Sequence, residues 1–242
     1  MKVSSELVAV IEQRLRIVRA RMARSCDRVG RPVESVRLVA VTKRQSLDAV
    51  AAAISLGLQD VAENYAQELI SKAGGWANLA SPPPPTWHAI GYLQRNKVAR
   101  LMPWVDWIDS VDRVALVEAL AAGAAQRHDR PLRCLVQVNI SNEPQKSGCT
   151  EAALPAILDA FSCTQGALVC CGLMGIPPAG THPEQSRPFF RRLRELRDRY
   201  ALAAHPHVEL TELSMGMSHD FDIAIEEGAT QIRVGTALFG AR

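Results

Sequence analysis

Residues 36–43 read VRLVAVTK, an apolar run rich in β-branched residues that ends in a lysine. A run without polar alternation is typical of a strand that is buried on both faces of a parallel sheet. Residues 46–56 then carry apolar side chains at helical spacing, and Gly57 is a suitable residue to end that helix. The stretch therefore predicts a strand followed by a helix, with Lys43 at the carboxyl end of the strand.

The same order of strand and helix recurs along the rest of the chain. Eight strand candidates occupy residues 36–42, 60–63, 87–90, 104–108, 132–140, 167–174, 208–213 and 231–234. Helical spacing follows at residues 46–56, 65–72, 93–101, 113–127, 151–161, 183–203 and 220–227. This order predicts a parallel α/β fold, a (β/α)8 barrel of the TIM type, with a doubly wound sheet as the alternative.

Two segments stand apart from this order. Residues 4–28 predict an amphipathic helix, so we expect residues 1–30 to add an N-terminal helix that packs on the barrel. Residues 81–85, SPPPP, predict a stiff surface connector. We expect one domain over residues 1–242, without a second β domain after the last strand.

Charge and cysteine usage bear on several classes of function. The 28 basic and 25 acidic residues give a net charge of only +3, so the composition does not support nucleic-acid binding. No apolar stretch approaches the ~18 residues of a membrane span. The six cysteines form no CxxC or Cys/His cluster, so we expect no metal site. Without a leader-like N-terminus, a cytoplasmic protein with reduced thiols is expected.

Functional side chains of such barrels lie at the carboxyl ends of the strands. Lys43 holds such a place, where partial desolvation favours the neutral amine that attacks a carbonyl group. A lone lysine there fits equally well as a side chain that extends into solvent. The other polar or functional candidates at strand ends are Glu63, Asn64, His88, Asn139, Met174, Ser214, Arg233, Gly235 and Thr236.

Two loops favour a functional role for Lys43. Residues 214–218, SMGMS, follow the seventh strand, and Gly235 with Thr236 follows the eighth. Loops at these places commonly hold a phosphate group through backbone N–H groups and hydroxyls. Each segment alone also fits an ordinary helix cap. Together with Lys43 they predict a phosphate site beside an amine that forms imines.

Arg233 ends the last strand beside these loops and allows two interpretations. It fits an ion pair with a carboxylate at the barrel mouth, or a donor to a ring nitrogen of a bound cofactor. Because arginine does not readily give up its proton, such a nitrogen would stay unprotonated. His88 has no further ligands at metal spacing, so we expect a structural histidine.

Ordered segments of the chain also carry a family resemblance. They are LVAVTK (38–43), ENYAQE (63–68), WHAIGYLQRNK (87–97), VQVNISNEPQKSG (136–148), GLMGIP (172–177), ELSMGMSHDF (212–221) and IRVGTALFGAR (232–242). The chain resembles the pyridoxal phosphate homeostasis proteins, which are related in fold to the alanine racemase barrel. The resemblance implies a barrel of fold type III that binds pyridoxal 5′-phosphate (PLP) as an aldimine, a Schiff base on Lys43.

The resemblance also implies roles for further residues. Arg233 would lie near the pyridine nitrogen, and Lys146 would be a second lysine near the pocket. Asn64 and Met174 would line the ring. The implied phosphate contacts are Ser214, Gly216, Met217, Ser218, Gly235 and Thr236.

Three functions remain open on the sequence. The first is a carrier that holds PLP for intracellular vitamin B6 homeostasis without turnover. The second is a fold-type III PLP enzyme such as an amino-acid racemase, and the third is a barrel enzyme that forms a Schiff base with a sugar phosphate. Because an open barrel mouth suits delivery better than protected carbanion chemistry, we expect the carrier. We also expect a monomer, with PLP-dependent apo-enzymes as recipients.

Overall fold

The structure, a computed structural model, describes residues 3–79, 83–125, 130–178, 180, 182–203 and 205–240. Residues 81–82 of the proline connector and residues 126–127 of the predicted fifth helix lie outside the described residues. The same holds for residues 1–2 and 241–242 of the expected domain.

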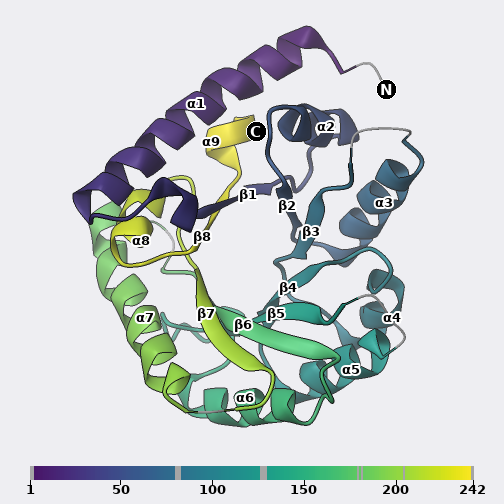
Figure 1. The fold of residues 1–242 in the computed structure, drawn as a ribbon, viewed down its shortest axis with the longest axis vertical. Helices are drawn as coiled ribbons and strands as arrows, with labels where there is room; N and C mark the ends of the chain where they lie inside the picture. Colours follow the sequence, from purple (N-terminus) through teal and green to yellow (C-terminus); the bar gives the residue numbers. More distant parts are fainter. Residues whose placement is uncertain are drawn as a thin grey trace.

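Within the described residues, eight parallel strands close into a barrel in sequence order, and β1 also pairs with β8 (Figure 1). The strands are β1 (Arg37–Val41), β2 (Asp60–Glu63), β3 (Thr86–Ala89), β4 (Trp107–Val111), β5 (Leu132–Val138), β6 (Leu168–Gly175), β7 (Val208–Ser214) and β8 (Gln231–Val234). The predicted (β/α)8 barrel is confirmed, and the doubly wound sheet is excluded because that fold has two open edges.

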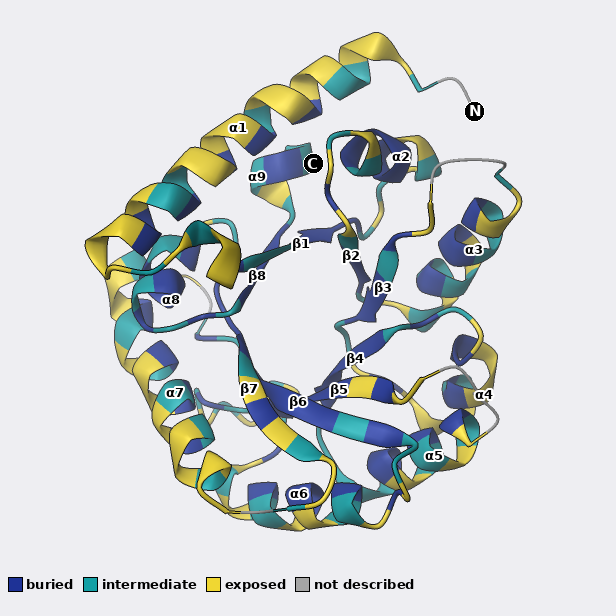
Figure 2. Ribbon diagram, in the orientation of Figure 1, coloured by how far each residue is buried: buried dark blue, intermediate teal, exposed yellow. Residues whose placement is uncertain are grey.

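Helices surround the barrel and turn their buried faces toward it (Figure 2). They are α1 (Ser5–Arg28), α2 (Leu47–Ser55), α3 (Ala66–Ala77), α4 (Val98–Leu101), α5 (Val114–Ala124), α6 (Leu154–Ser162), α7 (Arg187–Ala201), α8 (Phe221–Glu226) and α9 (Thr236–Phe239). Short 3-10 turns are η1 (Val33–Ser35), η2 (Arg95–Lys97), η3 (Glu151–Ala153) and η4 (Pro183–Ser186). We find no helix among the described residues whose length and apolar content would let it span a lipid bilayer.

The fourth strand lies three residues later than expected. The fourth strand was expected at residues 104–108, but β4 spans Trp107–Val111. Trp104 instead closes a turn after α4, because its N–H donates to the Leu101 carbonyl at 3.0 Å. Pairing with β3 begins only where the Asp106 N–H reaches the Trp87 carbonyl, at 2.9 Å. Tertiary hydrogen bonds therefore set the start of this strand.

The barrel interior has an unusual polar centre at His88, which is fully buried. Its Nδ1 lies 3.1 Å and 3.2 Å from the two carboxylate oxygens of Asp109, and its Nε2 lies 3.1 Å from Asp60. The ring also stacks on Trp107, with 5.4 Å between centroids. Because both nitrogens face carboxylates, both carry protons. This geometry supports the structural interpretation of His88.

The pKa of His88 follows from this geometry. Burial by itself lowers the pKa of an imidazolium, but the charge of Asp109 and the hydrogen bonds to both carboxylates outweigh it and raise the pKa to about 9. The unfolded chain has an ordinary histidine pKa of 6.5. Between these values the folded state therefore holds a proton that the unfolded state has lost.

This difference predicts how stability depends on pH. The contribution of His88 is fully present below pH 6.5 and is lost as the pH rises through about 9, because the unfolded state binds fewer protons in that window. In His88→Gln this pH dependence should disappear, and the free energy of unfolding at pH 6.5 should fall by about 3–5 kcal/mol as the carboxylates lose their counter-charge. Urea unfolding from pH 6 to pH 9 measures both. Parallel pH profiles for the two proteins would contradict the assignment.

Candidate functional site

A cavity of about 330 Å³ opens where the strands end in polar residues. This volume lies in the range of sites that hold small molecules. Its walls are Val41, Lys43, Asn64, Ile90, Gly91, Tyr92, Gln137, Val138, Asn139, Lys146, Ser147, Ile176, Met217 and Arg233. Of the residues to which the resemblance assigns cofactor contacts, Lys43, Asn64, Met217 and Arg233 line this one cavity. Lys146, expected near the pocket, and the strand-end candidate Asn139 line it as well.

Lys43 follows β1 in a turn whose backbone is held from outside the barrel. The Thr42 carbonyl accepts a hydrogen bond from Lys72 Nζ on α3, at 2.6 Å. The Arg44 N–H donates to a carboxylate oxygen of Glu68. Arg44 has a positive φ of 59°, which turns the chain sharply after the lysine. Contacts on both neighbours thus fix the place where the half-buried Lys43 enters the cavity.

Lys72 belongs to a buried charge cluster with Glu63 and Glu68. Its Nζ lies 2.7 Å from Glu63 and 2.8 Å from Glu68, and the Thr42 hydroxyl donates to Glu63 at 2.6 Å. Burial raises the pKa of Glu63, although the hydrogen bonds from Lys72 and Thr42 oppose the shift. Burial also acts on Glu68, but the bonds from Lys72 and the Arg44 N–H prevail and lower its pKa. The ion pair between Glu63 on β2 and Lys72 therefore links α3 to the rim of the barrel.

Arg233 is buried beneath the cavity and contacts neutral acceptors. Its guanidinium donates to the Ser214 hydroxyl at 2.7 Å and to the Gly175 carbonyl at 3.0 Å. Burial lowers the pKa of Arg233 to about 10, while the charges of Asp109 and Asp220 oppose the shift. The guanidinium thus stays charged at neutral pH. No carboxylate pairs with it within the described part of the chain, and Arg233 is among the residues that line the cavity.

The loops after β7 and β8 are brought together as expected. The Ser218 hydroxyl accepts hydrogen bonds from the N–H groups of Gly235, at 3.3 Å, and Ala237, at 3.2 Å. Gly216 has a φ of +89°, and a Cβ there would lie 2.5 Å from the Ala224 side chain. Only glycine fits that close approach. Ser218, Gly235 and the start of α9 at Thr236 thus form one backbone-rich wall beside Met217.

The other six residues to which the resemblance assigns cofactor contacts are not among the cavity walls: Gly216, Ser218, Gly235 and Thr236 in the loops after β7 and β8, and also Ser214 and Met174. Ser214 was expected to contact a phosphate, but it is fully buried and accepts the hydrogen bond from Arg233. Met174 was expected along a ligand ring, but it is fully buried and packs against Trp107, Leu135 and Cys171 below the cavity. These two side chains support the site from beneath and do not line the cavity.

The end of β5 and the loop after it supply further wall residues, of which Gln137, Val138 and Ser147 were not sequence candidates whereas Asn139 was. Gln137 donates to the Ser147 carbonyl at 3.1 Å, and a bridge between Val138 and Cys149 folds the loop back on the strand. Gly148 permits this, because a Cβ there would lie 2.7 Å from the Asn139 nitrogen. Gln137 lies two residues before Asn139, and alternate residues of a strand face the same side, so this spacing could have identified Gln137.

The same loop carries Lys146 to the cavity. Its Nζ donates to the Pro177 carbonyl at 2.9 Å and pairs with Glu143 at 2.6 Å. Lys146 is therefore held by the loop that contains it and by the segment after β6. The walls of the cavity thus include two lysines, Lys43 after β1 and Lys146 after β5.

The charge cluster beneath Lys43 makes a prediction about stability. Lys72→Met should lower the free energy of unfolding by about 3–5 kcal/mol, because it leaves the Glu63 carboxylate buried without a counter-charge. The double variant Glu63→Gln, Lys72→Met should lose less than the single variant. Urea unfolding at pH 7 measures both, with Lys97→Met as a control at the start of α4. Equal losses in single and double variants would show that the pair is not coupled.

Comparison with known proteins places this geometry in a family. The alanine racemase N-terminal domain family matches residues 16–242. The pyridoxal phosphate homeostasis protein of Aquifex aeolicus is 38% identical over 230 residues, which cover 95% of this chain and 97% of that protein. The structure of PipY from Synechococcus elongatus with PLP bound is 36% identical, with a TM-score of 0.81, and the match covers 95% of this chain and 100% of PipY.

A more distant likeness shows the fold alone. Alanine racemase from Corynebacterium glutamicum is 13% identical, with a TM-score of 0.66, and the match covers 97% of this chain and 61% of the racemase. The chain therefore belongs to the alanine racemase N-terminal domain family and, within it, to the pyridoxal phosphate homeostasis proteins.

Proposed function

We propose that this chain binds PLP in the cavity as a Schiff base on Lys43 and acts in PLP homeostasis without catalytic turnover. The observation that carries the proposal is the meeting of Lys43 and Arg233 in one cavity beside the joined loops after β7 and β8. The relationship to PipY, whose structure was solved with PLP bound, supports the same ligand.

The residues present fit the three reactive parts of PLP. The Lys43 amine suits its aldehyde, and water leaves as the C=N bond forms. Because the Gly235 N–H already donates to the Ser218 hydroxyl, the N–H groups of Ser218, His219 and Thr236 suit its phosphate. The Arg233 guanidinium suits its ring nitrogen as a donor.

Arg233 also supports the absence of turnover. Bound PLP supplies an aldehyde for amines and a ring that can accept electrons. Because Arg233 keeps its proton at neutral pH, it leaves the ring nitrogen unprotonated and the ring a weaker electron acceptor. The nearer relatives are named as homeostasis proteins, not as enzymes. The proposed role is therefore storage and delivery.

The proposal extends to partners and organisation. PLP-dependent apo-enzymes would receive the cofactor from a cytoplasmic monomer. Residues 1–242 would form one domain, in which α1 packs on the barrel beside α2, α8 and α9.

The proposed attachment of PLP to Lys43 can be tested directly. Protein loaded with PLP should show Schiff-base absorbance, and borohydride should trap the cofactor on the peptide that contains Lys43. Lys43→Ala should lose both signals because it lacks the amine, whereas Lys97→Ala, outside the cavity, should keep them. Spectra and peptide mapping provide the readout. Trapping on another lysine in the wild-type protein would refute the assignment.

The proposed absence of catalytic turnover can be tested with amino acids. PLP-loaded protein incubated with L-alanine, L-serine or L-lysine should form no more racemised or decarboxylated product than free PLP does. Chiral chromatography measures the products, with a PLP-dependent racemase as positive control. Turnover well above free PLP that is lost in Lys43→Ala would replace the carrier with an enzyme. A Schiff base with a sugar phosphate but none with PLP would favour the third function.

A further inference from the structure

The N-terminal helix packs against the parts of the barrel that carry the site. α1 contacts α2, α8 and α9, which follow β1, β7 and β8 (Figure 1). Lys43 and the loops at residues 214–218 and 235–236 lie between these strands and helices. The buried face of α1, which includes Leu15, Val18 and Met22, therefore rests on the supports of the site.

One side chain of α1 reaches the loop after β7 directly. Arg21 donates to the Ser218 carbonyl at 3.2 Å and to the Asp222 carboxylate at 3.1 Å through Nε. Its guanidinium also lies 4.1 Å from the centre of the Phe221 ring. Arg21 thus contacts the loop and the first turn of α8 together, from outside the barrel.

The bond to the Ser218 carbonyl constrains a particular peptide group. In a trans peptide the C=O and the N–H of the next residue point in opposite directions. Because Arg21 draws the Ser218 carbonyl toward α1, the N–H of His219 points away from α1. The hydroxyl of the same serine accepts the N–H groups of Gly235 and Ala237. Arg21 therefore fixes the serine that joins the two loops.

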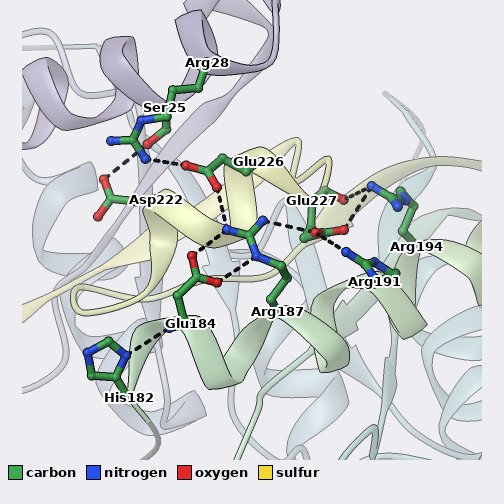
Figure 3. A network of polar contacts seen from close by, with 10 residues as sticks. All are labelled: Ser25, Arg28, His182, Glu184, Arg187, Arg191, Arg194, Asp222, Glu226 and Glu227. Atoms are coloured by element: carbon green, nitrogen blue, oxygen red, sulfur yellow. Dashed lines mark hydrogen bonds and ion pairs between the residues drawn. The ribbon is translucent and has the colours of Figure 1, made fainter.

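Other bonds hold α1 and α8 together without touching this loop. Arg28 pairs with Glu226, and the Ser25 hydroxyl donates to Asp222 at 3.4 Å (Figure 3). On the far side of α8, Arg187 lies 2.7 Å from Glu226 and 3.1 Å from Glu227 (Figure 3). The attachment of α1 therefore does not depend on Arg21 alone, and a separate role for Arg21 can be tested.

We propose that Arg21 is a positioning residue for the phosphate of the bound ligand, so that α1 is part of the cofactor site. The inference rests on the proposed function, because it assigns the joined loops to the PLP phosphate. Arg21 does not touch the ligand. It orients the Ser218–His219 peptide and keeps the loop in the conformation that receives an anion.

The test compares PLP with pyridoxal, which has the same aldehyde and ring but no phosphate. Removal of the charge-assisted bond in Arg21→Gln should weaken PLP binding about tenfold and leave pyridoxal binding within about twofold. Arg21→Lys, which keeps the charge, should recover part of the loss. Arg28→Gln, which loses only the pair with Glu226, should keep the wild-type ratio of the two affinities. So should Arg24→Gln, because Arg24 is exposed and has no ion pair among the described residues.

Absorbance titrations measure the affinities, and thermal unfolding checks that each variant is folded. Equal weakening of PLP and pyridoxal in Arg21→Gln, or no change in either, would overturn the positioning role. A change of the ratio in Arg28→Gln as large as that in Arg21→Gln would also overturn it.

Hydrogen exchange without ligand separates this inference from the proposed function. Amides at residues 216–222 should exchange faster in Arg21→Gln than in Arg28→Gln, whether or not PLP is the ligand. Equal exchange in the two variants would overturn the inference. Failure of the wild-type protein to bind PLP would overturn the proposed function and its phosphate assignment, while the exchange result would still decide whether Arg21 orders the loop.

Discussion

The pairing of β1 with β8 is the constraint on which the site depends. This parallel pairing sets Val39 beside Arg233 and Ala40 beside Val234, and it closes the barrel. The residues that follow β1 and β8 therefore lie at the same end of the barrel. Lys43 and Gly235 are far apart in the chain, yet closure places both at the mouth next to the buried Arg233. Without it, the Lys43 amine and the Arg233 guanidinium would not line one cavity together with Met217 of the loop after β7.

Closure of the barrel also buries charged side chains, and each buried charge needs a partner of opposite charge. His88 meets this demand as an imidazolium between Asp60 and Asp109. Asp109 in turn lies close enough to favour the charged form of Arg233. The Asp109 carboxylate thus interacts with two cations, the His88 imidazolium and the Arg233 guanidinium. Such a buried arrangement is costly unless every member finds hydrogen-bond partners, which Arg233 has in the Ser214 hydroxyl and the Gly175 carbonyl.

The outer shell supports the mouth of the barrel in a similar way. α3 contributes Lys72 to the turn that holds Lys43, and α1 contributes Arg21 to the loop after β7. In each case a long basic side chain from a helix donates to a backbone carbonyl of a candidate site residue or of its neighbour. Rigid placement of a binding group by supporting hydrogen bonds is what a pre-organised site requires. The extra N-terminal helix therefore does more than cover apolar surface.

The sequence by itself determined the order of strands and helices, favoured the barrel over the doubly wound sheet, and located the strand ends at which the candidate site lies. It did so because apolar periodicity and turn residues are local properties, as in the run from Val36 to Lys43. It also placed the two loops that meet at Ser218, since barrels of this type share that arrangement.

Only the tertiary structure decided where individual side chains point and what holds them. Cys171 and Met174 share the barrel interior although they are three residues apart, because β6 shifts register between Cys170 and Gly172. Gly172 allows the close approach of Glu212, where a Cβ would lie 1.9 Å from its carbonyl oxygen. Such a shift depends on the neighbouring strand, as the bond from Arg21 to Ser218 depends on a distant helix. Contacts between distant segments of the chain therefore set the directions of these side chains, and no local pattern encodes them.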